Sequence, residues 1–312
     1  MTNWKTICQA GARCARFPFE LGSYADAAER LLLLGYDEPS MPQLFIIGLP
    51  RSGTTLVYQY IVHRLAVSYF TNGVGKLPKA PCLTTFWQRM IYGDYSSDFK
   101  SHYGKVMGPV APREAGAFWA RFFGVDDYVS FDSLSIIKVR TLQKTIACVE
   151  CIFGGAPFVN KNVKHLLRID AIRGIFQQSH FLVVERDRID VALSLLRGKY
   201  EMLGDPKQWL SARPPDYDAL KNLSPPEQVM WQLVSLNAKM ETDISYLGSK
   251  NVMRLKYETF CDQPEQVIEM LGSSFAKTRT RNPAQEGFKR SKQGPRNNEE
   301  ETLVRLVENA DL

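Results

Sequence analysis

The sequence predicts an α/β fold, a three-layer sandwich in which helices flank both faces of a central parallel sheet. Short strand-like runs recur along the chain, and the first of them, at 44–47, is apolar throughout, which is typical of a strand buried in a parallel sheet. Stretches of helical composition and periodicity separate these runs. Strands that alternate with helices form parallel sheets through crossover connections, which gives the three layers.

The first informative unit spans a helix, a strand, a loop and a second helix. Ala25 to Leu34 is rich in alanine, leucine and glutamate and stops at Gly35, which predicts a helix. Leu44 to Ile47 is apolar throughout and predicts a buried strand. The loop from Gly48 to Gly53 follows directly, and a helical pattern runs from Thr54 to Leu65.

The later elements follow from the same patterns. Further strands are expected over residues 66–71, 157–161, 180–184 and 251–255. Further helices are expected over 84–92, from Pro112 onward, and over 133–153, 164–176, 189–197, 227–247 and 265–271. Residues 204–226 hold five prolines and predict an irregular excursion. No linker divides residues 1–312, so we expect one domain, with a helical N-terminal segment over 1–40.

Composition excludes several classes of protein. With 312 residues, of which 45% are hydrophobic, the chain can bury a core and is not mainly disordered. Its six cysteines show no disulfide framework, so free thiols are expected. No apolar run approaches the roughly 18 residues of a membrane span. We therefore expect a cytoplasmic protein with no membrane span. The net charge of +6 suits an anionic ligand but is no sign of nucleic-acid binding.

A basic segment lies between residues 277 and 296. Seven basic residues face a single acid, Glu286. Two interpretations remain open, a solvated tail and a cationic flap over a phosphate. In the second, Lys289 and Arg290 are the expected contacts.

Gly48 and Gly53 have the spacing of a phosphate-binding loop between a strand and a helix, which predicts a P-loop-like nucleotide-binding core. The glycines let backbone N–H groups and the helix N-terminus point at an anion. Position 54 is threonine, where the loop of ATPases and kinases carries lysine, and Arg51 is the nearby cation. The loop therefore suits a phosphate, whereas triphosphate chemistry is disfavoured.

A second anion site is expected after the strand at 180–184. Arg186 follows this strand and so should lie at the carboxyl edge of the sheet, where α/β proteins bind ligands. Ser194 lies about two helical turns further on. Its hydroxyl and the Arg186 guanidinium can hold one anion together, so the chain offers two phosphate sites for one nucleotide.

Four segments together resemble sulfotransferases that use 3′-phosphoadenosine 5′-phosphosulfate (PAPS). The run Leu49-Pro-Arg-Ser-Gly-Thr-Thr-Leu56 resembles their 5′-phosphosulfate loop, and Glu185-Arg-Asp-x-x-Asp-Val-x-x-Ser194 their 3′-phosphate motif. Val159-Asn-Lys-Asn162 is similar to a segment of the tyrosylprotein and broader bacterial branch. Tyr257-Glu-Thr-Phe with Asp262-Gln-Pro resembles a later family segment.

The resemblance implies roles for individual residues. Ser52, Gly53, Thr54 and Thr55 would hold the 5′-phosphate, and Tyr257 would contact the nucleotide. Arg51 would face the reacting end of the cofactor, and Lys161 would assist at the leaving oxygen. No metal is required by this chemistry.

The position of the general base differs from the position that it has in the tyrosylprotein branch. That branch carries a glutamate about twenty residues after the loop, but here the position falls at Thr71 and Asn72. Two substitutes remain open. Glu114 is expected in the first turn of the helix after Pro112, and His102 lies in a loop.

We therefore interpret the chain as a PAPS-dependent sulfotransferase that acts by direct in-line transfer. Its acceptor would be a hydroxyl or amine of a small molecule or glycan. A P-loop small-molecule kinase and a non-catalytic nucleotide- or polyanion-binding module are the alternatives. The sequence does not indicate the acceptor or the oligomeric state.

Overall fold

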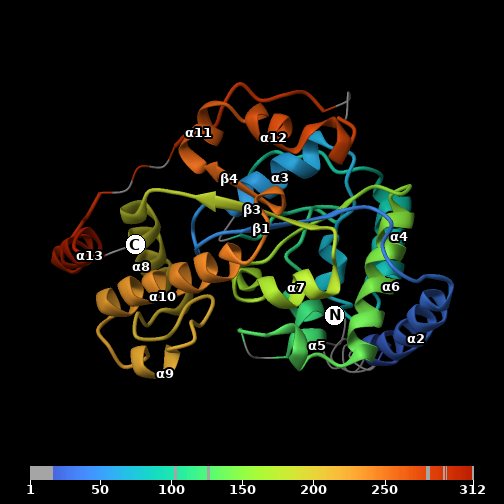
Figure 1. Cartoon of the computed structure of the whole chain (residues 1–312), viewed down its shortest axis with the longest axis horizontal. Helices are drawn as coiled ribbons and strands as arrows, with labels where there is room; N and C mark the ends of the chain where they lie inside the picture. The colour runs from blue at the N-terminus through green and yellow to red at the C-terminus, as the bar shows by residue number, and fades with distance from the viewer. Residues whose placement is uncertain are drawn as a thin grey trace, which may run out of the picture.

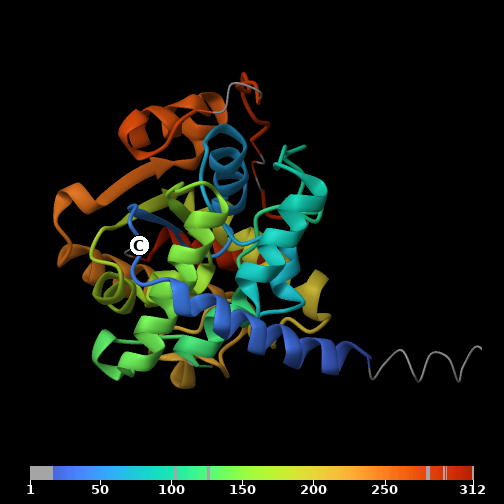
Figure 2. The same ribbon diagram turned by 90° about the vertical axis from the view of Figure 1, so that its right-hand side faces the viewer.

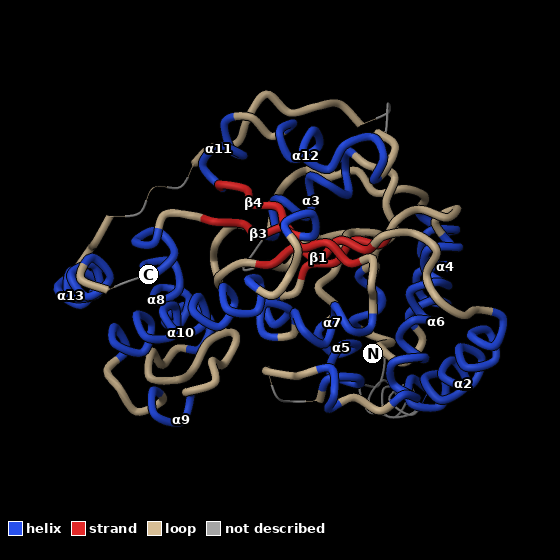
Figure 3. Tube along the Cα trace, viewed as in Figure 1, coloured by secondary structure: helices blue, strands red, loops and turns tan. Residues whose placement is uncertain are grey.

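The protein is built around a four-stranded parallel sheet with the strand order β2-β1-β3-β4. Its computed structural model describes residues 17–101, 104–124, 127–278, 282–290, 292 and 294–310. The strands are β1 (Gln43–Ile47), β2 (Phe158–Lys161), β3 (Ser179–Glu185) and β4 (Val252–Lys256). Figure 3 shows them in the middle of the molecule, between two layers of helices.

Alternate residues of the central strands enter two separate cores, because successive side chains of a strand point to opposite faces. Leu44 and Ile46 pack with α3 (Thr54–Arg64), α11 (Tyr257–Asp262) and α12 (Glu265–Phe275). Phe45 and Ile47 pack on the other face, which is covered by α5 (Gly116–Phe123), α6 (Ile136–Ile152) and α7 (Ile169–Ile175). Figure 1 shows both layers, so the predicted three-layer α/β fold is confirmed.

A third core lies beyond the end of β3. It joins α8 (Arg188–Leu203), α10 (Pro225–Ser245) and α13 (Asn298–Glu308) around Leu195, Leu233 and Leu303. Arg197 on α8 also forms an ion pair of 2.6 Å with Glu300 on α13. This bundle lies on the left of Figure 1.

The opposite flank is formed by α2 (Phe17–Leu32), α4 (Pro81–Tyr92) and α6. The buried carboxylate of Glu29 on α2 accepts hydrogen bonds from the backbone N–H groups of Cys82 (2.8 Å) and Leu83 (3.0 Å). It thereby satisfies two donors at the start of α4 that have no partner within the helix.

The smaller elements complete the chain. A four-residue helix, α9 (Tyr217–Leu220), lies in the proline-rich excursion. Single 3₁₀ turns cover Leu33–Gly35, Asn72–Gly75, Phe131–Ser133, Val163–Leu167 and Ser249–Asn251. In the described part of the chain no helix is both long and apolar enough to cross a bilayer. Cys82, Cys148, Cys151 and Cys261 are free thiols, and Cys8 and Cys14 lie outside the described residues.

The strand expected over residues 66–71 does not form a ladder. Ser68 makes a single parallel bridge to β2, through hydrogen bonds to Pro157 and Val159. The two ends of the segment diverge, because Leu65 pairs with Thr278 and Thr71 pairs with Pro112. The segment is therefore a buried edge connection.

The predicted start of the helix after Pro112 is also wrong. The Arg113 N–H donates to Phe70 O (2.8 Å), which keeps this part of the chain extended. Ala115 then adopts a left-handed conformation with φ 53°, and α5 begins only at Gly116. Glu114 therefore lies before the helix and not in its first turn.

Other boundaries moved for local reasons. The helix expected over 164–176 breaks at Arg168, whose φ of −129° divides a 3₁₀ turn from α7. The helix α10 begins at Pro225, because proline suits the first helical position and Ser224 and Glu227 form a capping box. The helices α11 and α13 were not predicted.

Candidate active site

The loop between β1 and α3 is pressed against its neighbours at both glycines. A Cβ atom on Gly48 would lie 2.6 Å from Val184 O and 2.7 Å from Ser52 Oγ. Gly53 has a φ of 92°, and a Cβ atom there would lie 2.2 Å from the Tyr257 ring. Both positions need glycine, and the loop therefore lies tightly between β3 and the start of α11.

Two arginines and a serine meet beside this loop. Arg51 has a left-handed backbone (φ 72°), and its Nε donates to Ser194 Oγ at 3.0 Å. Arg186 Nη1 donates to Arg51 O (3.2 Å), and its Nη2 lies 3.5 Å from Asp190 Oδ2. Burial and the nearby Arg186 cation lower the pKa of Arg51. Two like charges held this close favour an anion between or beside them.

Tyr257 joins the glycine loop to Arg186. Its ring packs on Gly53, and the Arg186 guanidinium lies 4.8 Å from the ring centroid. Burial raises the pKa of the Tyr257 hydroxyl, so the group stays protonated at neutral pH. The next residue, Glu258, accepts a hydrogen bond from the Asp187 N–H at 3.0 Å. The first turn of α11 is thus fixed to the end of β3.

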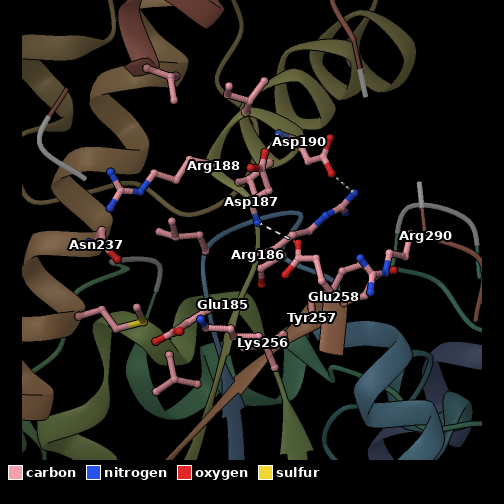
Figure 4. A pocket seen from close by; sticks show the side chains of 18 of the residues that line it. Glu185, Arg186, Asp187, Arg188, Asp190, Asn237, Lys256, Tyr257, Glu258 and Arg290 are labelled. Atoms are coloured by element: carbon pink, nitrogen blue, oxygen red, sulfur yellow. Dashed lines mark hydrogen bonds and ion pairs between the residues drawn. The ribbon is translucent and has the colours of Figure 1, made fainter. Parts of the chain in front are cut away.

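A cavity of about 1140 Å³ opens at the carboxyl ends of β3 and β4. Figure 4 shows Arg186 extending along it toward Asp190, with Tyr257, Glu258 and Arg290 close by. Arg290 forms an ion pair with Asp262. Ser52 and Lys292 also line the cavity, whereas Lys289 is exposed and does not.

The rest of the basic segment packs against the α3 side of the protein. Phe288 stacks on Phe260 and meets Tyr60 and Phe99 edge-on, with the Phe99 and Phe288 ring centroids 5.0 Å apart. The Asn282 side chain donates to His63 O at 2.6 Å. Residues 282–290 are therefore docked on α3 and α11 by an aromatic contact.

A charged pair lies on the other side of the loop. Lys161, at the end of β2, is buried, and its Nζ forms an ion pair with Glu114 Oε1. A Cβ atom on Gly104 would lie 3.2 Å from Glu114 Oε1 and 3.6 Å from Thr55 Oγ1. The carboxylate of Glu114 and the hydroxyl of Thr55 therefore face the same small space beside Gly104.

Two asparagines flank Lys161 and hold the backbone that carries Glu114. Asn162 Nδ2 donates to Glu114 O (3.1 Å), and Asn160 Nδ2 donates to Arg113 O (3.2 Å). Asn160 Oδ1 in turn lies 3.0 Å from Trp119 Nε1 and 2.9 Å from His165 Nε2. Burial lowers the pKa of His165, so its ring is neutral and donates from Nε2. Three consecutive residues thus fix the 113–114 backbone and side chain.

The structure brings most of the expected site residues together. Arg51, Ser52, Gly53, Arg186, Ser194 and Tyr257 gather around the loop, and Thr55, Lys161 and Glu114 gather on its other side. Thr54 is buried at the start of α3. His102 lies outside the described residues.

Sequence reasoning missed the hydrogen-bonding role of Asn160 and the buried pair Trp119 and His165. The only signal for them was the run Asn-Lys-Asn, which does not name its partners. Asn72, at the place where the resembling branch has its base, donates to Val106 O and Gly108 O at 2.7 and 2.6 Å. It is therefore a hydrogen-bonded residue of the 72–75 turn.

Comparison with known proteins assigns the chain to a family. The family model described as "Sulfotransferase family" matches residues 42–275, three quarters of the chain. The sulfotransferase STF1 from Mycobacterium tuberculosis H37Rv has a TM-score of 0.52 at 11% identity, over 80% of this chain and 72% of that chain. The sulfotransferase STF9 from Mycobacterium avium has a TM-score of 0.51 at 16% identity, over 88% and 68%.

At these identities, the two structural matches show the fold alone. No curated protein sequence matches the chain significantly. The match to the family model extends from β1 through the glycine loop, Lys161 and Arg186 to the end of α12. The chain belongs to the sulfotransferase family.

Proposed function

We propose that the protein transfers a sulfonyl group from PAPS directly, in line, to a hydroxyl or amine of a small molecule or glycan. The observation that carries this proposal is the placement of two sets of groups around one glycine loop. Arg51, Arg186 and Ser194 lie on one side, and the Lys161–Glu114 pair lies beside Thr55 on the other. The first set suits a nucleotide with two anionic groups, and the second suits proton transfer at an acceptor.

The residues around the loop fit the donor. Ser52 lines the cavity, and its buried hydroxyl has no hydrogen-bond partner among the described residues. An unsatisfied buried hydroxyl costs about 1–3 kcal/mol, and an arriving phosphate oxygen would remove this cost. Side chains at Gly48 or Gly53 would close the space that the loop needs. The cations Arg51 and Arg186 supply the matching charge.

Each part of the loop region has a distinct binding role in this proposal. Ser52, Gly53, Thr54 and Thr55 bind the 5′-phosphate with the N-terminus of α3, whose backbone N–H groups attract anions. Arg186 and Ser194 bind the 3′-phosphate. Tyr257 and Arg290 line the cavity that receives the rest of the nucleotide. When bound, PAPS supplies the activated sulfonyl group.

Lys161 and Glu114 act at the reacting end. Lys161 stabilises negative charge at the leaving oxygen, because its buried ammonium is held beside the loop by Glu114. Glu114 accepts the proton of the attacking hydroxyl or amine. Arg51 holds the reacting end of the donor from within the loop.

The test of the activity is an incubation with PAPS and a panel of hydroxyl and amine acceptors. Mass spectrometry should detect a sulfonated product together with 3′-phosphoadenosine 5′-phosphate. ATP with Mg²⁺, offered to the same panel, should give no phosphorylated product. Phosphoryl transfer, or tight nucleotide binding without any turnover, would overturn the proposal.

The test of the donor uses Arg186→Ala. This variant should weaken binding of 3′-phosphoadenosine 5′-phosphate about 100-fold, since a charge-assisted pair contributes up to about 3 kcal/mol. Binding of adenosine 5′-phosphosulfate, which lacks the 3′-phosphate, should change far less. Arg140→Ala on the exposed surface of α6 is the control for loss of one positive charge. Equal losses for both ligands would show that Arg186 does not bind the 3′-phosphate.

A further inference from the structure

The helix α4 carries an exposed apolar stripe. Phe86, Trp87, Met90 and Ile91 are 45%, 52%, 58% and 64% exposed. They occupy positions i, i+1, i+4 and i+5 of the helix, which place them on one face. With Tyr92, this 12-residue helix holds five of the 17 large hydrophobic side chains that are exposed among the described residues. We call the four residues on one face the α4 stripe.

The rest of α4 is firmly seated, so the stripe is a fixed surface. Cys82 and Thr85 are buried against the protein, and Glu29 caps the first turn. Arg89 Nη1 donates to Ile152 O at 2.5 Å, and its Nη2 pairs with Asp94 at 2.8 Å. Figure 1 places α4 on the flank opposite α8, α10 and α13, and Figure 2 views the molecule from that flank.

The stripe is as large as the largest apolar patch of a typical monomer. Two aromatic and two long aliphatic side chains, each about half exposed, present on the order of 400 Å² of apolar surface. A patch of this size lies in the range of about 300–600 Å² for the largest patch of a typical monomer, and such patches are often functional. The rings of Phe86 and Trp87 meet edge-on with their centroids 5.6 Å apart, so the apolar surface is continuous between them.

The charge around the stripe indicates which kind of partner binds there. Lys76 and Lys79, just before α4, are exposed, and Arg89 within α4 is paired with Asp94, so the charge beside the stripe comes from the two lysines. A second copy of the chain docked through the same stripe would bring these like charges together, which disfavours self-association. An anionic bilayer would instead attract them while its acyl region receives the aromatic and aliphatic side chains.

We propose that α4 docks the protein onto an anionic bilayer surface. The helix lies in the plane of the interface, with the α4 stripe inserted below the headgroups. Lys76 and Lys79 lie against the anionic headgroups. This binding is independent of the sulfonyl-transfer chemistry, because no residue of the stripe lines the cavity or contacts the Lys161–Glu114 pair.

The experiment is sedimentation of the full chain with vesicles of equal parts phosphatidylcholine and phosphatidylglycerol, or of phosphatidylcholine alone. The protein should bind the anionic vesicles at least 10-fold more tightly. Its binding should weaken at 1 M salt, where charges are screened beyond about 3 Å. Phe86→Ser/Trp87→Ser/Ile91→Ser should lower the partition coefficient at least 10-fold. Trp231→Ser, which removes an exposed tryptophan from α10 on the opposite flank, should leave it unchanged.

Tryptophan fluorescence locates the contact. Vesicles that carry brominated acyl chains should quench the wild-type protein, and Trp87→Phe should abolish most of this quenching while it preserves binding. Circular dichroism establishes that each variant is folded.

Three results would overturn the proposal. One is absence of wild-type binding to the anionic vesicles, and another is equal binding by the folded stripe variant. The third is concentration-dependent self-association, seen in sedimentation without vesicles and lost in the stripe variant, which would assign the stripe to a second copy of the chain.

Discussion

The two sides of the glycine loop are built in different ways. The nucleotide side consists of two short segments that folding brings together: Ser52 to Thr55 are contiguous, and Ser194 lies eight residues after Arg186. The acceptor side joins Lys161 to Glu114 across 47 residues. Each segment of neighbouring site residues leaves a pattern in the sequence, whereas two single residues that meet by folding leave none.

The two sides are also held in place differently. The nucleotide side depends on backbone shape, because Gly48 and Gly53 touch Val184 and Tyr257 without room for a Cβ atom. The acceptor side depends on side-chain amides, because Asn160 and Asn162 hold the carbonyl groups of residues 113 and 114. We therefore expect glycine substitutions to abolish nucleotide binding and asparagine substitutions to slow turnover.

The largest effect is expected at Gly53. Gly53→Ala should weaken binding of 3′-phosphoadenosine 5′-phosphate by about 100-fold or more, since a strained φ and a clash with Tyr257 together cost about 3 kcal/mol. Isothermal titration calorimetry measures this loss. Gly204→Ala is the matched control, because Gly204 also has a positive φ of 70° but has no atom near its Cβ position.

Backbone strain at a left-handed glycine is common to both variants, and only Gly53→Ala adds a collision at the loop. If Gly204→Ala weakened the nucleotide as much as Gly53→Ala, the effect would come from general destabilisation. The nucleotide side would then not depend on the shape of the loop.

The second effect concerns the proton acceptor. Glu114→Gln should lower the turnover number about 100-fold or more, because general-base catalysis contributes about 10²–10⁴-fold. Its affinity for 3′-phosphoadenosine 5′-phosphate should stay at the wild-type value. Steady-state kinetics and calorimetry on the same preparation separate the two sides of the loop.

His102 provides the competing prediction. If Glu114→Gln turns over normally and His102→Ala is slow, then histidine is the base and Glu114 only orients Lys161. If both variants turn over normally, the acceptor is an amine that has already lost its proton.

A third, smaller effect tests how Glu114 is held. Asn162 is a positioning residue that donates to Glu114 O and also accepts from the Lys164 N–H at 3.0 Å. Asn162→Ser keeps an acceptor for Lys164 but is too short to reach Glu114. Turnover should fall about fivefold, because one hydrogen bond contributes about 1 kcal/mol.

A merely structural role for Asn162 would lower the thermal stability and leave the pH dependence of turnover unchanged. Displacement of Glu114 from Lys161 should instead shift the pH at which turnover is half-maximal. An unshifted pH profile in Asn162→Ser would show that Asn162 does not position Glu114.

The same contrast explains which parts of the fold could be predicted. The runs at 44–47, 157–161, 180–184 and 251–255 are each contiguous, so the four strands and their order along the chain follow from local pattern. The edge connection at 66–71 looks like a strand, but its ends pair with Thr278 and Pro112, and no local pattern reveals such partners. The start of α5 was misplaced for the same reason, since Phe70 holds Arg113 in an extended conformation.

The smallest effect on turnover is expected at Glu150, at the opposite end of the sheet from the loop. Its buried carboxylate accepts from the Ser40 N–H at 3.0 Å, just before β1, and burial raises its pKa to about 7. Between the ordinary glutamate pKa and pH 7, the folded protein keeps a proton that the unfolded chain has lost. The free energy of unfolding should therefore fall as the pH rises through this window.

Glu150→Gln removes this titration and should raise the free energy of unfolding at pH 8 by about 1–3 kcal/mol, since each pKa unit corresponds to about 1.4 kcal/mol. Denaturant unfolding of the wild type and of Glu150→Gln at pH 5 and pH 8 measures this difference in the free energy of unfolding. Glu300→Gln is the control of opposite sign, because the ion pair with Arg197 lowers the pKa of Glu300 and stabilises the fold above that pKa. Turnover of Glu150→Gln should equal the wild-type value wherever both are folded. Any pH dependence of turnover that Glu150→Gln still shows is then due to groups on the acceptor side of the loop. A changed turnover number in Glu150→Gln would mean that the two ends of the sheet are coupled.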